Sequence, residues 1–141
     1  MARLHALIVF EDRPESRWLR PLRPGFRHCF CLLRQPQGWL LLDSRTRTLD
    51  IRQIPPCGAD SLVRAFVELG AHVVGLAAGT PSSRRMPPQP FSCVELVKRA
   101  IGCAHPAILS PFQLYRHLRS HPRRLLLACP GKRAVDEGNR I

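Results

Sequence analysis

The sequence predicts an α+β fold in which an antiparallel sheet packs against a helix that begins at a cysteine. Strand-like runs follow one another in the first half of the chain, amphipathic helices are frequent in the second half, and 14 prolines keep the elements short. At 141 residues, with 45% hydrophobic residues, the chain can bury one core. We therefore expect one domain over residues 1–130 and a flexible tail over residues 131–141.

Four short runs in the first half have the composition of strands. "HALIVFE" is β-branched at its centre and predicts a first strand. "FRHCFCLLR" and "WLLLDS" flank "PQG" and predict a hairpin, and "TLDIRQI" predicts a further strand. We expect these strands to be consecutive and antiparallel.

The next two runs predict a helix and a buried strand. "LVRAFVELG", which Asp60-Ser61 opens, has apolar residues at helical spacing, and Gly70 is suited to end the helix. "AHVVGLAAG" is short and apolar, as a strand buried on both faces would be.

Two further helices follow a proline-rich loop. We expect the first to run from Cys93 to Ile101, with Ser92 as its N-cap and Gly102 at its end. Ser110-Pro111 predicts the start of the second, because Ser supplies a capping oxygen and Pro suits the first helical position. The run "RRLLLAC" near the end then predicts a short strand or a docked arm.

The chain is strongly basic. It has 22 Lys and Arg against 10 Asp and Glu, a formal net charge of +12, which attracts nucleic acid, anionic polymers or acidic partners. The basic residues are scattered, however, and one Tyr and two Trp give no pattern of a base-stacking surface. An anionic partner therefore stays open as an alternative to a small substrate.

Six cysteines raise the question of a disulfide framework. The start "MARLHALIVFEDRPE" has a short apolar run that ends in acids, unlike a secretory signal peptide. We expect reduced thiols in a cytoplasmic protein. No run approaches the roughly 20 apolar residues of a membrane span, so we expect none.

Cys93 is the first candidate for chemistry. If Ser92 caps the helix, Cys93 lies in the first turn among unpaired backbone N–H groups, at the positive end of the helix dipole. That position lowers the pKa of a thiol and favours the nucleophilic thiolate. The alternative is that Cys93 is a small buried hydrophobic residue.

A cysteine nucleophile needs a histidine and a group that orients the imidazole. Strand alternation places Phe26, His28 and Phe30 on one face, and Cys29 and Cys31 on the other. A turn centred on Gln35-Pro36 places Asp43 directly opposite His28. A loop two residues longer places Asp43 opposite Phe30, still on the face of His28, whereas an odd-length loop separates them.

Both partners also have a plain structural interpretation. His28 is equally a hydrogen-bonded core histidine, and Asp43 a strand-end residue that bonds the following turn. Taken together with a cysteine at a helix start, the three residues indicate a catalytic triad.

The order of these residues resembles the circularly permuted branch of the papain-like fold, the NlpC-like group of peptidases and amidases. "FRHCFCLL" is similar to the family's histidine strand, "GWLLLDS" to the strand that bears the orienting residue, and "FSCVELVKRAIG" to the nucleophile helix. The resemblance covers roughly residues 25 to 102. It implies Cys93 as nucleophile, His28 as general base and Asp43 as orienting residue. Ser92 stands where the family often has Asn or Asp, and the family's orienting residue is more usually His, Asn or Gln.

Other constellations in the sequence give weaker signals. Cys29 and Cys31 lack a second zinc-ligand pair and are expected in the core. His117 and His121 have the spacing of a zinc pair, but the metalloprotease Glu is missing and Arg119 disfavours a cation. "GLAAGT" lacks the lysine of a phosphate loop, so we expect no metal and no cofactor.

The sequence thus leads to two hypotheses of function. The first is a thiol hydrolase, a small peptidase or amidase that forms an acyl-thioester at Cys93 on a peptide or amide substrate. The second is a non-catalytic basic module that binds an anionic partner such as nucleic acid or a phage or cell-wall component. The compact, arginine-rich chain is reminiscent of small phage genes.

Overall fold

A computed structural model of the whole chain describes residues 3–12, 24–44, 48–78 and 93–131. The elements in chain order are β1 (Leu4–Glu11), β2 (His28–Gln35), β3 (Gly38–Ser44), β4 (Leu49–Ile54), α1 (Ala59–Glu68), β5 (His72–Ala77), α2 (Cys93–Ile101), α3 (Pro111–Arg119) and β6 (Arg124–Ala128). The described chain is therefore α+β, as predicted. The expected tail beyond residue 131 lies outside the described residues.

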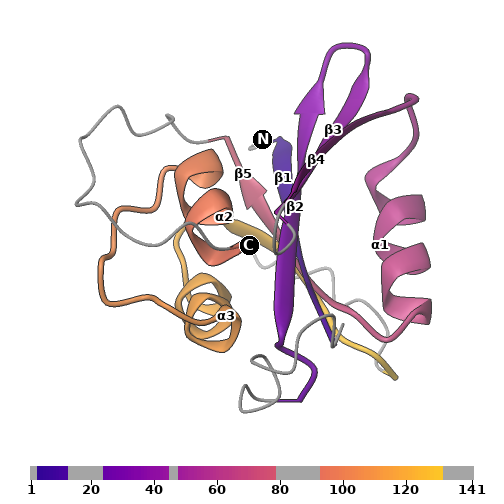
Figure 1. Cartoon of the computed structure of the whole chain (residues 1–141). Helices are drawn as coiled ribbons and strands as arrows, with labels where there is room; N and C mark the ends of the chain where they lie inside the picture. The colour runs from indigo at the N-terminus through magenta and orange to yellow at the C-terminus, as the bar shows by residue number, and fades with distance from the viewer. Residues whose placement is uncertain (1–2, 13–23, 45–47, 79–92, 132–141) are drawn as a thin grey trace.

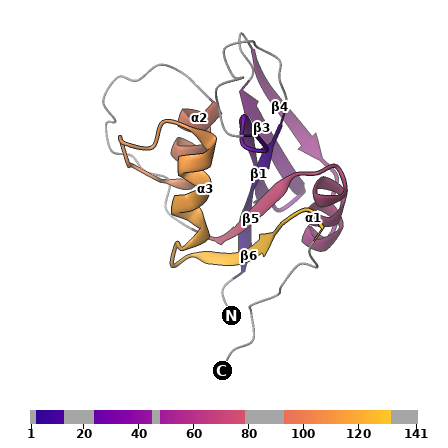
Figure 2. The ribbon, with the colours of Figure 1, turned by 90° about the horizontal axis from the view of Figure 1, so that it is seen from below.

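One antiparallel sheet organises the molecule. Its strand order is β4-β3-β2-β1-β5-β6, with every neighbouring pair antiparallel. Helices α2 and α3 cover one face of the sheet and α1 covers the other (Figures 1 and 2). The prediction of consecutive antiparallel strands in the first half is confirmed.

Two apolar clusters fill the spaces between these layers. One lies beneath α2 and α3 and includes Cys29, Cys31 and Val97, and the other lies beneath α1 and includes Phe30 and Val63. The middle of β1 contributes to both clusters, because its successive side chains point to opposite faces.

Two sequence predictions need correction. Helix α1 begins at Ala59 with Gly58 as N-cap, so Asp60 lies in the first turn rather than before it. Gly58 caps with its backbone, whose carbonyl accepts from Ser61 N–H. Strand β2 begins at His28, so Phe26 lies outside the alternation and packs in the cluster beneath α2 and α3 instead of sharing a face with Phe30.

The ends of the later helices agree with the sequence. Helix α2 covers Cys93–Ile101 and is followed by Gly102 at φ +76°. Helix α3 begins with a complete capping box, in which Ser110 accepts from Gln113 N–H and the Gln113 side chain accepts from Ser110 N–H. No helix in the described ranges is long and apolar enough to cross a membrane.

Candidate active site

The β2–β3 hairpin brings His28 and Asp43 together. Gln35 pairs with Gly38 around a two-residue loop, so the loop length is even, the condition that places His28 and Asp43 on one face. The observed pairing of Cys31 with Leu42, extended by one residue, places Asp43 opposite Phe30. His28 and Asp43 are therefore diagonal neighbours on one face, the second of the two registers that the sequence allowed.

A short hydrogen bond joins the two side chains. His28 Nε2 lies 2.6 Å from Asp43 Oδ1. Both residues are buried, with 8% of His28 and 4% of Asp43 exposed. A buried, charge-assisted contact of this kind fixes the orientation of the imidazole ring.

Helix α2 carries Cys93 to the start of β2. Its apolar stripe, which includes Val94, Val97 and Ile101, is buried against the sheet and holds the helix in place. Cys93 is the first helical residue and is only partly buried. The predicted cap, Ser92, lies outside the described residues.

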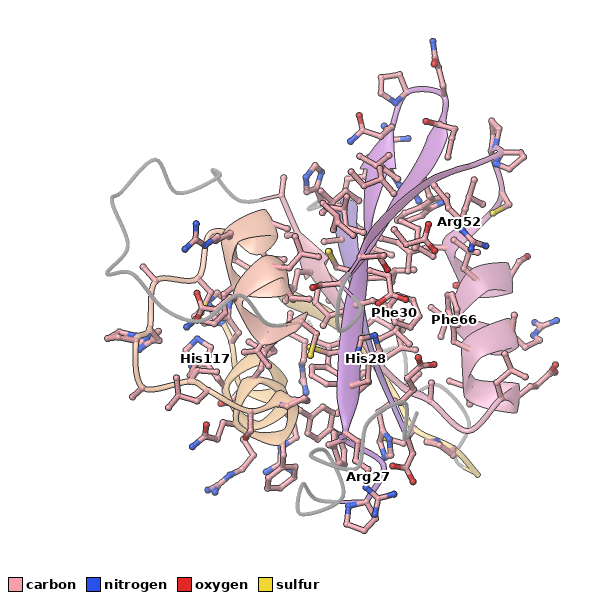
Figure 3. All side chains as sticks on the ribbon, viewed as in Figure 1. Arg27, His28, Phe30, Arg52, Phe66 and His117 are labelled. Atoms are coloured by element: carbon pink, nitrogen blue, oxygen red, sulfur yellow. The ribbon has the colours of Figure 1, made fainter. Side chains whose placement is uncertain are left out.

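The first two residues of β2, His28 and Cys29, have side chains that point to opposite faces of the sheet. Cys29 belongs to the cluster beneath α2 and α3. Phe30, which shares the face of His28, points toward Phe66 of α1, with ring centroids 5.5 Å apart (Figure 3). Cys93 packs against the cluster that contains Cys29, and both Cys29 and His28 influence the pKa of its thiol.

These contacts lower the pKa of the Cys93 thiol to about 5. Hydrogen bonding to the Cys29 side chain contributes most, burial acts in the opposite direction, and His28 adds to the lowering through a hydrogen bond and its charge. Burial alone would lower the pKa of His28, but the contacts with Asp43 and Cys93 outweigh it and raise that pKa to about 10. Near neutral pH the site therefore holds a thiolate beside an imidazolium.

The sequence did not assign Cys29 to the site. The prediction that Cys29 and Cys31 are core residues is confirmed, since both are fully buried. Burial and the Cys93 thiolate together raise the pKa of Cys29 well above its ordinary value, so Cys29 stays a neutral S–H donor. Its position next to His28 was the available signal, but interpreting it required knowing which face α2 covers.

The histidines of α3 and of the segments on either side of it form a separate group. The ring of His117 lies 4.6 Å from that of His105 and 5.5 Å from that of His121, between centroids. His121 Nδ1 accepts from Arg123 N–H. Within the described parts of the chain, no three or more His, Cys, Asp or Glu side chains are arranged to hold a metal ion.

We found no match to this chain among protein-family models, curated proteins or solved structures. What the site can do chemically therefore follows from its own residues.

Proposed function

We propose that the protein is a thiol hydrolase, a small peptidase or amidase, with Cys93 as its nucleophile. The observation that carries the proposal is the convergence on Cys93 of His28, itself fixed by Asp43 at 2.6 Å, and of the Cys29 thiol. A thiolate with a pKa of about 5 is ionised throughout the neutral range. The Cys93 residue is partly exposed, as a nucleophile that meets a substrate must be.

The reaction would proceed in two displacements at one carbonyl carbon. The Cys93 thiolate attacks the carbonyl and forms a C–S bond, and the negative charge moves to the carbonyl oxygen. His28 then donates its proton to the leaving amine as the C–N bond breaks, which leaves an acyl-thioester on Cys93. Water, deprotonated by His28, attacks the thioester and releases the acid, and the proton returns to the Cys93–His28 pair.

Asp43 and the helix start have supporting roles in this scheme. Because Asp43 binds Nε2 of His28, Nδ1 is the ring nitrogen left to exchange a proton with Cys93 and substrate. The backbone N–H groups in the first turn of α2 are suited to stabilise the oxyanion. Cys29, as a neutral donor to the thiolate, is a positioning residue rather than a reactant.

The resemblance to the permuted papain-like branch supports the same proposal. The histidine strand precedes the cysteine helix in the chain, and α2 packs on the strands that carry His28 and Asp43. We extend the proposal to the fold family on this basis. The reaction requires a free thiol at Cys93. We therefore also propose that the protein acts in a reducing compartment such as the cytoplasm.

Acylation by p-nitrophenyl acetate tests this function. We expect a burst of p-nitrophenolate near one equivalent per chain, with the acetyl group on the peptide that contains Cys93. Cys93→Ala should abolish the burst and His28→Ala should slow it about 10²-fold or more, the usual contribution of a positioned acid–base group. Acetylation spread over the six thiols, or a burst unchanged in His28→Ala, would sink the proposal.

The net charge of +12 favours a second candidate, a non-catalytic module that binds an anionic polymer. Binding of Cys93→Ser to heparin or single-stranded DNA at low salt, lost as salt rises, would support it. The same titration in a chain that shows no acylation burst would favour this candidate over the hydrolase. No binding even at low salt would remove it.

A further inference from the structure

A cavity lies at the opposite end of β2 from His28. Its volume is about 510 Å³. Residues from the start of β1, the β2–β3 turn and the segment after β4 line it, and the β2–β3 turn lies at the top of Figure 1. Cavities of roughly 300–1,000 Å³ are typical of small-molecule sites. Since β2 separates His28 from Arg34 by six residues, about 20 Å of strand, the cavity is distinct from the candidate active site.

The charge of this cavity is one-sided. Arg3, His5 and Arg34 line it, and none of the described residues that line it is Asp or Glu. Leu4, Pro36 and Pro56 add apolar walls. The lining therefore pairs uncompensated positive charge with an apolar surface.

Arg34 is held in place but incompletely bonded. Its guanidinium carbon lies 4.8 Å from the centroid of the Trp39 ring, a cation–π contact. Its Nε–H is buried and finds no acceptor within the described part of the chain. A buried donor without an acceptor costs free energy.

The floor beneath Arg34 is rigid. Trp39 is 1% exposed, and its indole Nε1–H donates to the carbonyl of Cys57 at 3.1 Å. Gly38 has φ +130°, and a Cβ built there would lie 2.1 Å from the carbonyl oxygen of Ile54. The turn is thus pressed against the end of β4, and the guanidinium is positioned before any ligand arrives.

We propose that this cavity binds a small organic anion, a phosphate or carboxylate group on an apolar body. The anionic oxygens would accept from the guanidinium groups of Arg34 and Arg3, whose planar donors suit both groups. The apolar body would lie against Leu4, Pro36 and Pro56. This second site does not depend on the hydrolase activity proposed for Cys93.

Calorimetric titration of the full chain tests the site with three probes of one size: phenyl phosphate, benzoate and the neutral benzyl alcohol. We expect one of the two anions to bind at one equivalent, and the tighter one identifies the head group. Bound anion should also slow iodoacetamide labelling of Cys57, an exposed thiol that lines the cavity. Equal affinity for benzyl alcohol, or no binding of either anion at millimolar concentration, would overturn the proposal.

Substitutions distinguish specific binding of an anion in this cavity from nonspecific electrostatic binding to a basic protein. Arg34→Gln should weaken anion binding by about tenfold or more, the loss expected for a buried hydrogen bond to a charge. Arg34→Lys, which keeps the charge without the planar fork, should also weaken it. The matched control is Arg64→Gln on the exposed surface of α1, which should leave the affinity unchanged. Equal losses in Arg34→Gln and Arg64→Gln would contradict the site.

Discussion

One buried charged pair lies within helix α2, and a second lies on the strands beside the start of that helix. The two pairs differ in the further group that each one contacts. Within the helix, Lys98 Nζ donates to Glu95 Oε1 at 2.8 Å and to the carbonyl of Ile108 at 3.1 Å. At the helix start, His28 and Asp43 form a pair of similar length, 2.6 Å, on the neighbouring strands. Both pairs place opposite charges beneath the surface.

The difference lies in the third group. Lys98 is 0% exposed, and its further contact is a backbone carbonyl, so this pair ties the chain after α2 to the helix. The further contact of His28 is the thiol of Cys93, a titratable and partly exposed group. The Lys98–Glu95 pair is therefore structural, whereas the His28–Asp43 pair becomes part of a reactive site because one member faces a nucleophile.

The largest effect on stability is expected from breaking the enclosed pair. Lys98→Met leaves Glu95 without its buried cation and should lower the free energy of unfolding by about 3–5 kcal/mol, measured by urea denaturation. Glu95→Leu/Lys98→Met, which removes both charges, should recover much of the loss. A cost below about 1 kcal/mol for the single change would mean that the pair contributes little to stability.

Cys29→Ala sharpens the comparison at the reactive pair. It removes the contact that lowers the pKa of Cys93 most, so the rate of iodoacetamide alkylation of Cys93 at pH 4, below the pKa in both proteins, should fall about tenfold if the pKa rises by one unit. The control is Cys31→Ala, which makes a similar cavity two residues away on the same face. Equal rates in the two variants would show that Cys29 only fills space.

Asp43→Asn should have a smaller, several-fold effect on the same rate. The amide keeps the shape but loses the charge that helps to raise the pKa of His28, so the imidazolium beside Cys93 is less stable. The matched control is Asp50→Asn. Asp50 lies opposite Asp43 in the pairing of β3 and β4, but its carboxylate forms an ion pair with the exposed Arg52 and not with His28. If Asp50→Asn slows the reaction as much, the effect of Asp43 is not specific.

The smallest effect concerns stability against pH. The raised pKa of His28 contributes stability that is full below its ordinary pKa of 6.5 and is lost as pH rises through about 10. The lowered pKa of Cys93 contributes stability that is full above its ordinary pKa of 9.0 and is lost as pH falls through about 5. Their opposite slopes cancel between pH 6.5 and 9.0, which predicts a plateau with losses on both sides.

In the wild type, the free energy of unfolding should decline between pH 6.5 and 5 because the Cys93 thiolate becomes protonated. Cys93→Ala should remove this decline. Cys57→Ala, at an exposed thiol, serves as control and should keep the wild-type profile. Urea denaturation at a series of pH values measures both variants. Superimposable profiles for wild type and Cys93→Ala would contradict the assigned ion pair.

The sequence predicted the parts of the site that depend on local rules. The spacing within the β2–β3 hairpin limited His28 and Asp43 to one face for any even loop, and Gly102 and Ser110 marked helix boundaries correctly. These features depend on turn length and capping, which neighbouring residues determine.

The remaining parts depend on contacts between distant segments. That β5 pairs with β1, and that α2 covers the face of Cys29, follow from how apolar surfaces are shared across the whole sheet. The role of Cys29 and the burial of Lys98 were therefore not predicted, because each requires knowing which layer covers which face.

The pH dependence of Cys93 alkylation by iodoacetamide, followed on the peptide that contains Cys93, tests the thiolate–imidazolium pair. In the wild type the rate should rise with a midpoint near pH 5, and in His28→Ala the midpoint should move up toward the ordinary thiol value. A wild-type midpoint near 9.0, the ordinary pKa of a cysteine thiol, or one that His28→Ala leaves unchanged, would contradict the thiolate–imidazolium pair.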